Sequence, residues 1–149
     1  MHIGIGNDHS AVDLKGIIKA YLEAKGHTVT DFGTQSKEAS AYPIYGARVA
    51  KAVAAGKVER GIVICGTGIG IGLAANRIPG IRCAICSEPF SARMAGMHNN
   101  CNMLAFGARV VGSEVAKMMV DEWLGASFEQ RHQPRLDMLD KLARGEEIE

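Results

Sequence analysis

Short runs of apolar residues alternate along the chain with longer stretches in which apolar residues recur at helical spacing. The short runs predict buried β-strands, and the longer stretches predict amphipathic helices. The expected strands are Ile3–Gly6, His27–Phe32, Gly61–Cys65, Ile81–Cys86 and Met103–Phe106. Strands that alternate with helices form parallel sheets with right-handed crossovers. The pattern therefore predicts an α/β fold with a parallel sheet, in one domain over residues 1–149.

The intervening helices have start and stop signals of their own. Lys25-Gly26 is typical of a helix end, and Pro43 of a helix start. Further helices are expected after the glycine-rich turn to about Asn76, over Glu88–Met97, around Met118 and Trp123, and over Pro134–Arg144, with a polar turn at Met97–Asn102. In open parallel sheets, ligands bind beyond the carboxyl ends of the strands. That rule selects the segments Asn7–Ser10, Cys65–Gly72, Ser87–Phe90 and the residues from Gly107 onward.

The composition and net charge of the chain indicate which kinds of partner it could bind. Hydrophobic residues make up 47% of the chain, charged residues 22%, and the formal net charge is +1. This balance argues against a nucleic-acid-binding or membrane-binding surface. No segment approaches the roughly 20 apolar residues of a membrane span, and Met1 leads straight into an apolar run rather than a secretory signal. We therefore expect a cytoplasmic protein whose four cysteines are free thiols.

The segment Cys65–Gly72, CGTGIGIG, joins a buried strand to a helix. Its glycines allow a sharp turn, and a helix N-terminus offers free N–H groups to an anion. A dinucleotide fingerprint starting at Gly66 would need glycine where Ile71 stands, and no P-loop lysine follows. Cys65 has two interpretations. It is either an inert buried thiol or, beside a helix N-terminus, a reactive thiolate.

Other polar residues also allow two interpretations. Asp8-His9 could belong to a site, or Asp8 could simply cap the next helix. His98-Asn99 is a weak signal alone, but the two histidine segments and the glycine-rich loop together indicate a site. Arg131 and Arg135 suit a phosphate dianion, although a solvated basic surface would look the same. The Cys-x-x-Cys pair Cys83 and Cys86 lies in an apolar strand, which favours a structural role over a metal site.

Taken in order, a series of segments resembles the type B ribose-5-phosphate isomerase family. The segments are Gly6–His9, Asp31–Thr34, Tyr42-Pro43, Ile64–Gly68, Ala74–Arg77, Gly80–Arg82, His98-Asn99, Phe106–Gly112 and Arg131-His132. The resemblance spans nearly the whole chain. It implies a Rossmann-like three-layer α/β/α sandwich with five parallel strands, and interconversion of ribose 5-phosphate and ribulose 5-phosphate through a cis-enediolate without a metal or other cofactor. It also implies a homodimer or tetramer with a site shared between subunits.

The resemblance also implies roles for individual residues. Cys65 would move the proton between C1 and C2, because the glutamate base of another family branch is replaced here by Ile71. Thr67, Asp8 and His98 would open the sugar ring. The enediolate would be held by Asn99 and by backbone N–H groups of the loop Gly66, Gly68, Ile69 and Gly70. The phosphate would be bound by His9, Arg109, Arg131 and Arg135, and Tyr42 would line the sugar site.

The chain departs from the family pattern at Ala41 and Asn100, where aspartate is usual, and at Gln130, where glycine is common. None of the three carries an assigned role, but all lie near the expected pocket. Two alternatives therefore remain open. The substrate could be another aldose phosphate such as allose 6-phosphate, or the chain could be a non-catalytic phosphosugar-binding module, because a fold does not fix a function.

Overall fold

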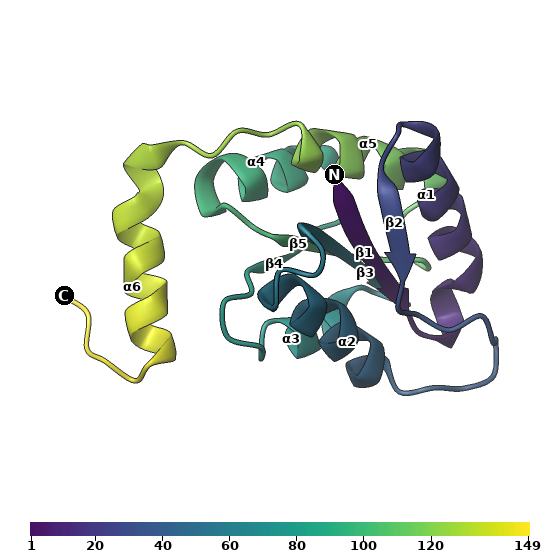
Figure 1. The fold of residues 1–149 in the computed structure, drawn as a ribbon, viewed down its shortest axis with the longest axis horizontal. Coiled ribbons are helices and arrows are strands. Elements are labelled where there is room, and N and C mark those ends of the chain that lie inside the picture. Colours follow the sequence, from purple (N-terminus) through teal and green to yellow (C-terminus); the bar gives the residue numbers. More distant parts are fainter.

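Five parallel strands run through the middle of the molecule (Figure 1). The computed structural model describes residues 1–149. The strands are β1 (His2–Asn7), β2 (Thr28–Asp31), β3 (Arg60–Cys65), β4 (Cys83–Ile85) and β5 (Met103–Gly107). They are hydrogen-bonded in the order β2-β1-β3-β5-β4, and every pair is parallel. The predicted α/β class and five-stranded parallel sheet are thereby confirmed.

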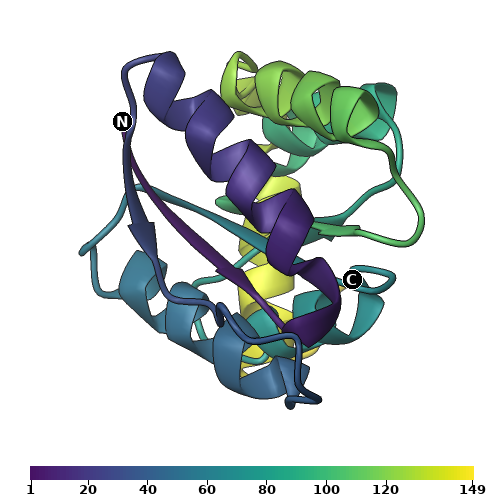
Figure 2. The same cartoon turned by 90° about the vertical axis from the view of Figure 1, so that its right-hand side faces the viewer.

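Helices cover both faces of this sheet (Figures 1 and 2). They are α1 (Val12–Ala24), α2 (Tyr42–Ala54), α3 (Ile69–Ala75), α4 (Pro89–Asn99), α5 (Ser113–Leu124) and α6 (Gln133–Ala143), with short 3-10 helices η1 (His9–Ala11) and η2 (Gln130–His132). Helices α1, α4 and α5 lie on one face, and α2 and α3 on the other. None of these helices has the length and apolar character needed to cross a bilayer.

The central strand β3 explains the near-continuous apolar run that the sequence shows. Ile62 and Ile64 pack into the core beneath α1, α4 and α5, whereas Val63 and Cys65 pack into the core beneath α2 and α3. A strand covered on both faces needs apolar side chains at successive positions rather than at alternate ones. This arrangement carries Cys65 to the carboxyl edge of the sheet, where the chain turns into α3.

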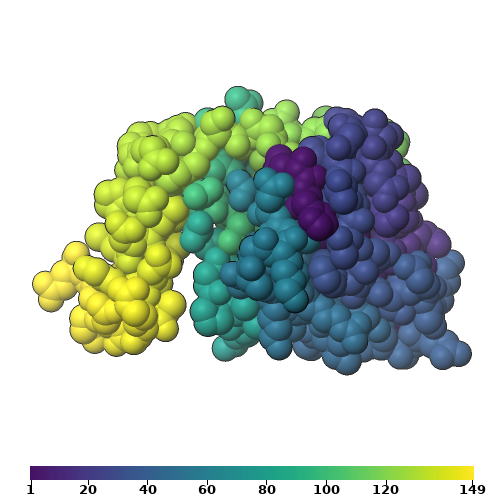
Figure 3. Space-filling model, viewed as in Figure 1, coloured from purple at the N-terminus to yellow at the C-terminus, as the bar shows by residue number.

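Helix α6 stands apart from the sheet at one end of the molecule (Figures 1 and 3). Only Leu136 of this helix is buried, while Met138, Leu139 and Leu142 are exposed. A cavity of about 530 Å³, whose lining includes Leu139 and Phe90, lies between α6, α4 and β4. An amphipathic helix normally covers its apolar face, so the apolar side of α6 lacks a partner within this chain.

One boundary differs from the sequence prediction in a way that affects the site. Helix α4 continues to Asn99, so His98 and Asn99 lie in its last turn and not in a polar turn. The helix ends at Asn100, which adopts the left-handed conformation with φ 44°. Asparagine tolerates this conformation better than most residues. The helix therefore ends at Asn99, two residues later than the apolar periodicity predicted.

The long connection between β2 and α2 is tied to the carboxyl edge of the sheet by buried polar groups. Lys15, only 2% exposed, forms an ion pair with Asp31 at 2.8 Å and donates a hydrogen bond to the carbonyl of Thr34. Burial alone would raise the pKa of Asp31, but hydrogen bonds from Lys15 and the Gly33 N–H lower it. The Asn7 amide donates to the carbonyls of both Thr34 and Asp8. These contacts hold the connection beside Asp8.

Candidate active site

Cys65 ends β3 with its side chain at the start of the glycine-rich turn. It is 5% exposed, and its Sγ accepts a hydrogen bond from the N–H of Gly68 at 3.2 Å. Gly68 has φ 82°, and a Cβ at this position would lie 2.6 Å from the backbone of Phe106. Only glycine fits both conditions. The backbone conformation that brings an N–H to the sulfur therefore depends on Gly68.

The same turn leaves backbone N–H groups available. The Thr67 hydroxyl accepts the N–H of Ile69 at 3.2 Å, whereas the N–H groups of Gly66 and Gly70 donate to no protein atom. Free N–H groups at the first turn of a helix favour a negatively charged oxygen. Beside a thiol, this arrangement can stabilise an oxyanion that forms when a proton leaves carbon.

Cys65 opens into a cavity of about 240 Å³. It is lined by Asp8, His9, Ser10, Tyr42, Cys65, Gly66, Thr67, Gly70 and Arg109. The structure thus brings together most of the residues that the sequence indicated at the strand tips. Two predicted residues of the glycine-rich turn are not in this lining: Gly68 packs on Phe106, and the side chain of Ile69 is exposed.

Asp8 caps a helix and also lines the cavity. Its side chain caps η1 by accepting the N–H of Ser10 at 2.9 Å, and it also accepts the Ser10 hydroxyl at 2.5 Å. At the same time Asp8 lines the cavity beside Thr67. The cap fixes the carboxylate in position, so one residue both starts a helix and faces the pocket.

His9 is held in one tautomer by the connection after β2. The backbone N–H of Ser40 donates to Nδ1 of His9 at 3.1 Å, and the Ser40 hydroxyl accepts a hydrogen bond from the backbone N–H of His9 at 3.1 Å. Because Nδ1 accepts a hydrogen bond, the neutral ring carries its proton on Nε2. His9 can therefore donate this proton to an anionic ligand in the cavity.

Tyr42 and Arg109 form walls of the cavity on either side of the glycine-rich turn. A Cβ on Gly70 would lie 2.6 Å from the ring of Tyr42, so the missing side chain makes room for this ring. A Cβ on Gly66 would lie 3.4 Å from a terminal nitrogen of Arg109. The guanidinium group therefore lies over the turn and adds a positive charge to the pocket.

The remaining predicted residues form a second group. The His98 ring lies 4.5 Å from the His132 ring, and Arg135 donates to Nδ1 of His132 at 3.1 Å. Arg131 forms an ion pair with Glu129 at 2.7 Å. Asn99 lines the larger cavity near α6 rather than the Cys65 cavity. None of these residues lines the Cys65 cavity within this chain.

The two groups are separated because they belong to opposite edges of the sheet. Cys65 pairs with Gly107 at the carboxyl end of β5, whereas His98 and Asn99 precede Met103 at its amino end. At about 3.3 Å per residue, β5 alone spans roughly 13 Å. Within one chain, therefore, the Asp8-His9 segment lies beside the glycine-rich loop and the His98-Asn99 segment does not.

The chain is similar to known proteins over most of its length. The model of the family described as Ribose/Galactose Isomerase matches residues 3–139. The chain is 53% identical over 138 residues to ribose-5-phosphate isomerase B of Escherichia coli (strain K12), covering 92% of this chain and 93% of that protein. The chain belongs to the ribose/galactose isomerase family. This assignment confirms the resemblance found in the sequence and makes the chain a sugar-phosphate isomerase.

Other members of the ribose/galactose isomerase family are similar over most of their length. The chain is 45% identical over 130 residues to D-erythrulose-4-phosphate isomerase of Pectobacterium atrosepticum, covering 87% of this chain and 86% of that protein. The structure of ribose-5-phosphate isomerase B from Clostridium thermocellum matches with a TM-score of 0.95 at 47% identity, covering 97% of this chain and 99% of that one. The Rossmann-like three-layer fold is thereby confirmed. The relatives, however, are named for different sugar phosphates.

Some residues of this family member could not be found from sequence patterns. Ser40 lies 31 positions from His9 and has no periodicity or motif to mark it. Glu129 also had no predicted role, and His132 was named only as part of the Arg131-His132 segment; the structure places both beside His98. Burial, Arg131 and His98 together lower the pKa of His132, so this ring is neutral at pH 7. All four cysteines are free thiols, as the sequence predicted.

Proposed function

We propose that this family member interconverts ribose 5-phosphate and ribulose 5-phosphate. The observation that carries the proposal is the Cys65 thiol, which meets an N–H donor and unpaired backbone N–H groups at one end of a small polar cavity. Carbon–acid chemistry needs a base beside an oxyanion site, and these groups supply both. The relative with 53% identity is a ribose-5-phosphate isomerase B, which favours the pentose.

In the proposed reaction, the Cys65 thiolate removes the C2 proton from the open-chain aldose. The electron pair moves into a C1–C2 double bond, and the carbonyl oxygen on C1 becomes the enediolate oxygen. Backbone N–H groups of Gly66 and Gly70, together with Asn99, hold that charge. Cys65 then returns the proton to C1 while the proton of the C2 hydroxyl moves to O1, which gives the ketose. Asp8, Thr67 and His98 open the sugar ring before this step.

We propose further that two subunits build each site. The Cys65 cavity contributes the base, His9 and Arg109, while His98, Asn99, Arg131 and Arg135 come from a second copy. Two observations support this arrangement: the two groups lie at opposite edges of one sheet, and α6 exposes an apolar face beside a cavity. A homodimer is therefore the smallest active unit, since two-fold symmetry completes both sites at once.

A substrate panel tests the reaction. EDTA-treated protein is supplied with ribose 5-phosphate, allose 6-phosphate, galactose 6-phosphate and erythrulose 4-phosphate, and the isomeric products are measured. We expect the highest kcat/KM with ribose 5-phosphate, and no loss of activity on chelation because protein groups alone perform the enediolate chemistry. A higher kcat/KM with another sugar would reassign the substrate, and activity that returns only with a divalent ion would refute the metal-free mechanism.

Arg135 offers a test of the phosphate site. Charge-assisted hydrogen bonds are worth about 1.5–3 kcal/mol each, so Arg135→Ala is expected to raise KM for ribose 5-phosphate roughly ten- to a hundredfold. Arg144, exposed at the end of α6, provides a matched control, because Arg144→Ala removes the same charge outside the site. Steady-state kinetics with phosphorylated and unphosphorylated ribose show whether Arg135 binds the phosphate or has a structural role. Equal weakening with both sugars would make Arg135 a structural residue.

A further inference from the structure

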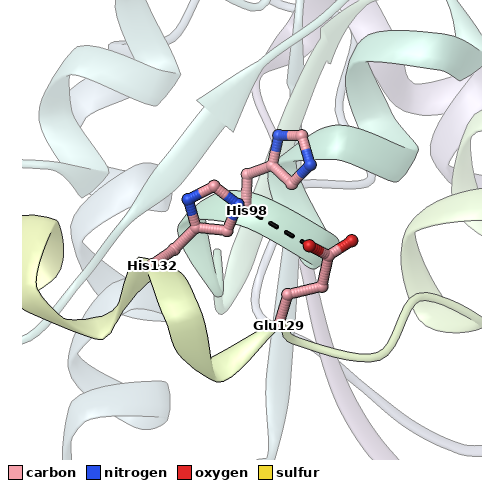
Figure 4. A group of neighbouring side chains, drawn as sticks. All are labelled: His98, Glu129 and His132. Atoms are coloured by element: carbon pink, nitrogen blue, oxygen red, sulfur yellow. Dashed lines mark ion pairs between the residues drawn. The ribbon is translucent and has the colours of Figure 1, made fainter.

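Three side chains with metal-binding atoms lie close together at the N-terminal end of α6. His98 comes from the last turn of α4, Glu129 from the segment after α5, and His132 from η2 (Figure 4). One ligand atom of each lies within 4.8 Å of the others, and Nε2 of His132 lies 3.8 Å from a Glu129 oxygen. The sequence suggested no metal-ligand set, because these residues approach one another only in the folded chain.

The buried ring of His132 gives an independent reason to expect a ligand here. His132 is 5% exposed, and its Nε2 has no hydrogen-bond partner. A buried polar atom without a partner costs free energy, so such atoms are uncommon in native proteins. In Figure 4 the atom faces Glu129 and the ring of His98. A cation bound between the three side chains would use this atom as a ligand once its proton has moved to Nδ1.

We propose that His98, Glu129 and His132 form a zinc-binding site that inhibits the enzyme. Two histidines and one glutamate, with water in the fourth position, are a ligand set that Zn²⁺ uses in proteins. Ligand bonds of about 2.0–2.2 Å in a tetrahedron require ligand atoms about 3.4 Å apart. Rotation of the partly exposed Glu129 side chain brings its oxygen from 3.8 Å to this distance from Nε2 of His132 without a movement of the chain between them. The ring of His98, whose centroid lies 4.5 Å from that of His132, must turn as well.

Two arginines beside the site limit its affinity and give the proposal a directional test. Arg135 donates to Nδ1 of His132, which leaves the proton on Nε2. A metal on Nε2 moves that proton to Nδ1, so the Arg135 contact is lost when the ion binds. Arg131 meanwhile holds a Glu129 oxygen in an ion pair. Zinc must therefore compete with both guanidinium groups.

Inhibition follows from the place of His98 in the reaction. This part of the inference rests on the proposed function, in which His98 opens the sugar ring. A ring nitrogen bound to zinc can neither accept nor donate a proton. Zinc therefore acts as a reversible inhibitor rather than as a cofactor, which agrees with the expected activity of the EDTA-treated protein. Binding of the ion is independent of the reaction and is measured without substrate.

Calorimetric titration of the EDTA-treated, dialysed full-length protein with Zn²⁺ tests the site. We expect one ion per chain. Mutation of a residue that only hydrogen-bonds to a metal ligand typically lowers metal affinity about 10–100-fold. Loss of a ligand itself, in Glu129→Gln or His132→Ala, should therefore weaken zinc binding at least about tenfold. Arg135→Ala should strengthen binding about tenfold, because it removes a unit charge a few ångströms from a divalent ion. His27→Ala, which removes a histidine that contacts the N-terminus, should change nothing.

Cysteine thiols could bind zinc in place of His98, Glu129 and His132, and a second set of measurements tests this alternative. Burial raises the pKa of Cys86 and Cys101 to about 11 and that of Cys83 further, which leaves Cys65 as the thiol to test. The titration is repeated with Cys65→Ala, which should bind zinc as the wild type does. Zinc should also slow wild-type isomerisation at concentrations that leave Glu129→Gln at its own zinc-free rate. Equal affinity in Glu129→Gln, His132→Ala and the wild type, or loss of binding in Cys65→Ala alone, would overturn the proposal. Binding without inhibition would refute the inhibitory role while leaving the isomerase assignment to the substrate panel.

Discussion

Replacement of Cys65 by alanine is expected to lower kcat for ribose 5-phosphate by roughly 10²–10⁴-fold, the usual contribution of a general acid–base group. The variant loses the sulfur that accepts the Gly68 N–H, but the backbone of the turn keeps its other contacts, including the bond from the Ala108 N–H to the Cys65 carbonyl. Substrate affinity should change little, because His9 and Arg109 remain in the cavity. Steady-state kinetics, with a thermal melt to confirm folding, measure the effect.

Cys86→Ala is the matched control for this loss. Cys86 is half-buried, lies outside the Cys65 cavity, and burial raises the pKa of its thiol to about 11. A thiol with such a pKa is protonated at pH 7 and cannot serve as a base. The control should therefore keep wild-type turnover. If Cys65→Ala kept it as well, the base would have to be another group of the cavity, and Asp8 would be the next residue to test.

The fold was predictable because β3 and its neighbours leave a strong local signal. Apolar residues at successive positions such as Ile62, Val63 and Ile64 indicate a strand covered on both faces. The glycine-rich turn after Cys65 was predictable for a similar reason: several glycines after such a strand are needed only where the backbone turns sharply against other atoms. The structure shows this close approach at Gly68 and Phe106.

The pairing of distant loops could not be predicted in the same way. Ser40 reaches His9 because Asn7 and Lys15 anchor the connection after β2, and these contacts join residues up to 31 positions apart. The end of α4 is set by Asn100, whose left-handed conformation stops the helix two residues after Met97, the last apolar residue. No local pattern marks the contact between Ser40 and His9, and Asn100 is one of several asparagines that could have ended the helix. His98 was therefore identified as a candidate residue, but it lies in the last turn of α4 rather than in the predicted polar turn.

A mixed dimer of two inactive variants is expected to recover about half of the wild-type turnover per dimer, because one of its two symmetric sites is intact. Cys65→Ala damages one half of the proposed site and His98→Ala the other. In each homodimer, both sites contain a damaged half. In the heterodimer, one site combines both damaged halves, and the second combines an unaltered Cys65 cavity with an unaltered His98. Co-expression with two different tags and tandem purification provides this species.

The control heterodimer carries Cys65→Ala in one subunit and Thr67→Ala in the other. Both residues line the same cavity, so no site of this dimer has an intact Cys65 half. Its activity should stay near that of the Cys65→Ala and Thr67→Ala homodimers. Recovery in the first heterodimer but not in the second requires that the His98 half come from the other subunit. If both heterodimers stayed inactive, each chain would have to complete its own site. In that case α4 would have to carry His98 from the amino edge of the sheet to the carboxyl edge, past the length of β5, a rearrangement that the packing of α4 against α5 and of Ala92 in the core opposes.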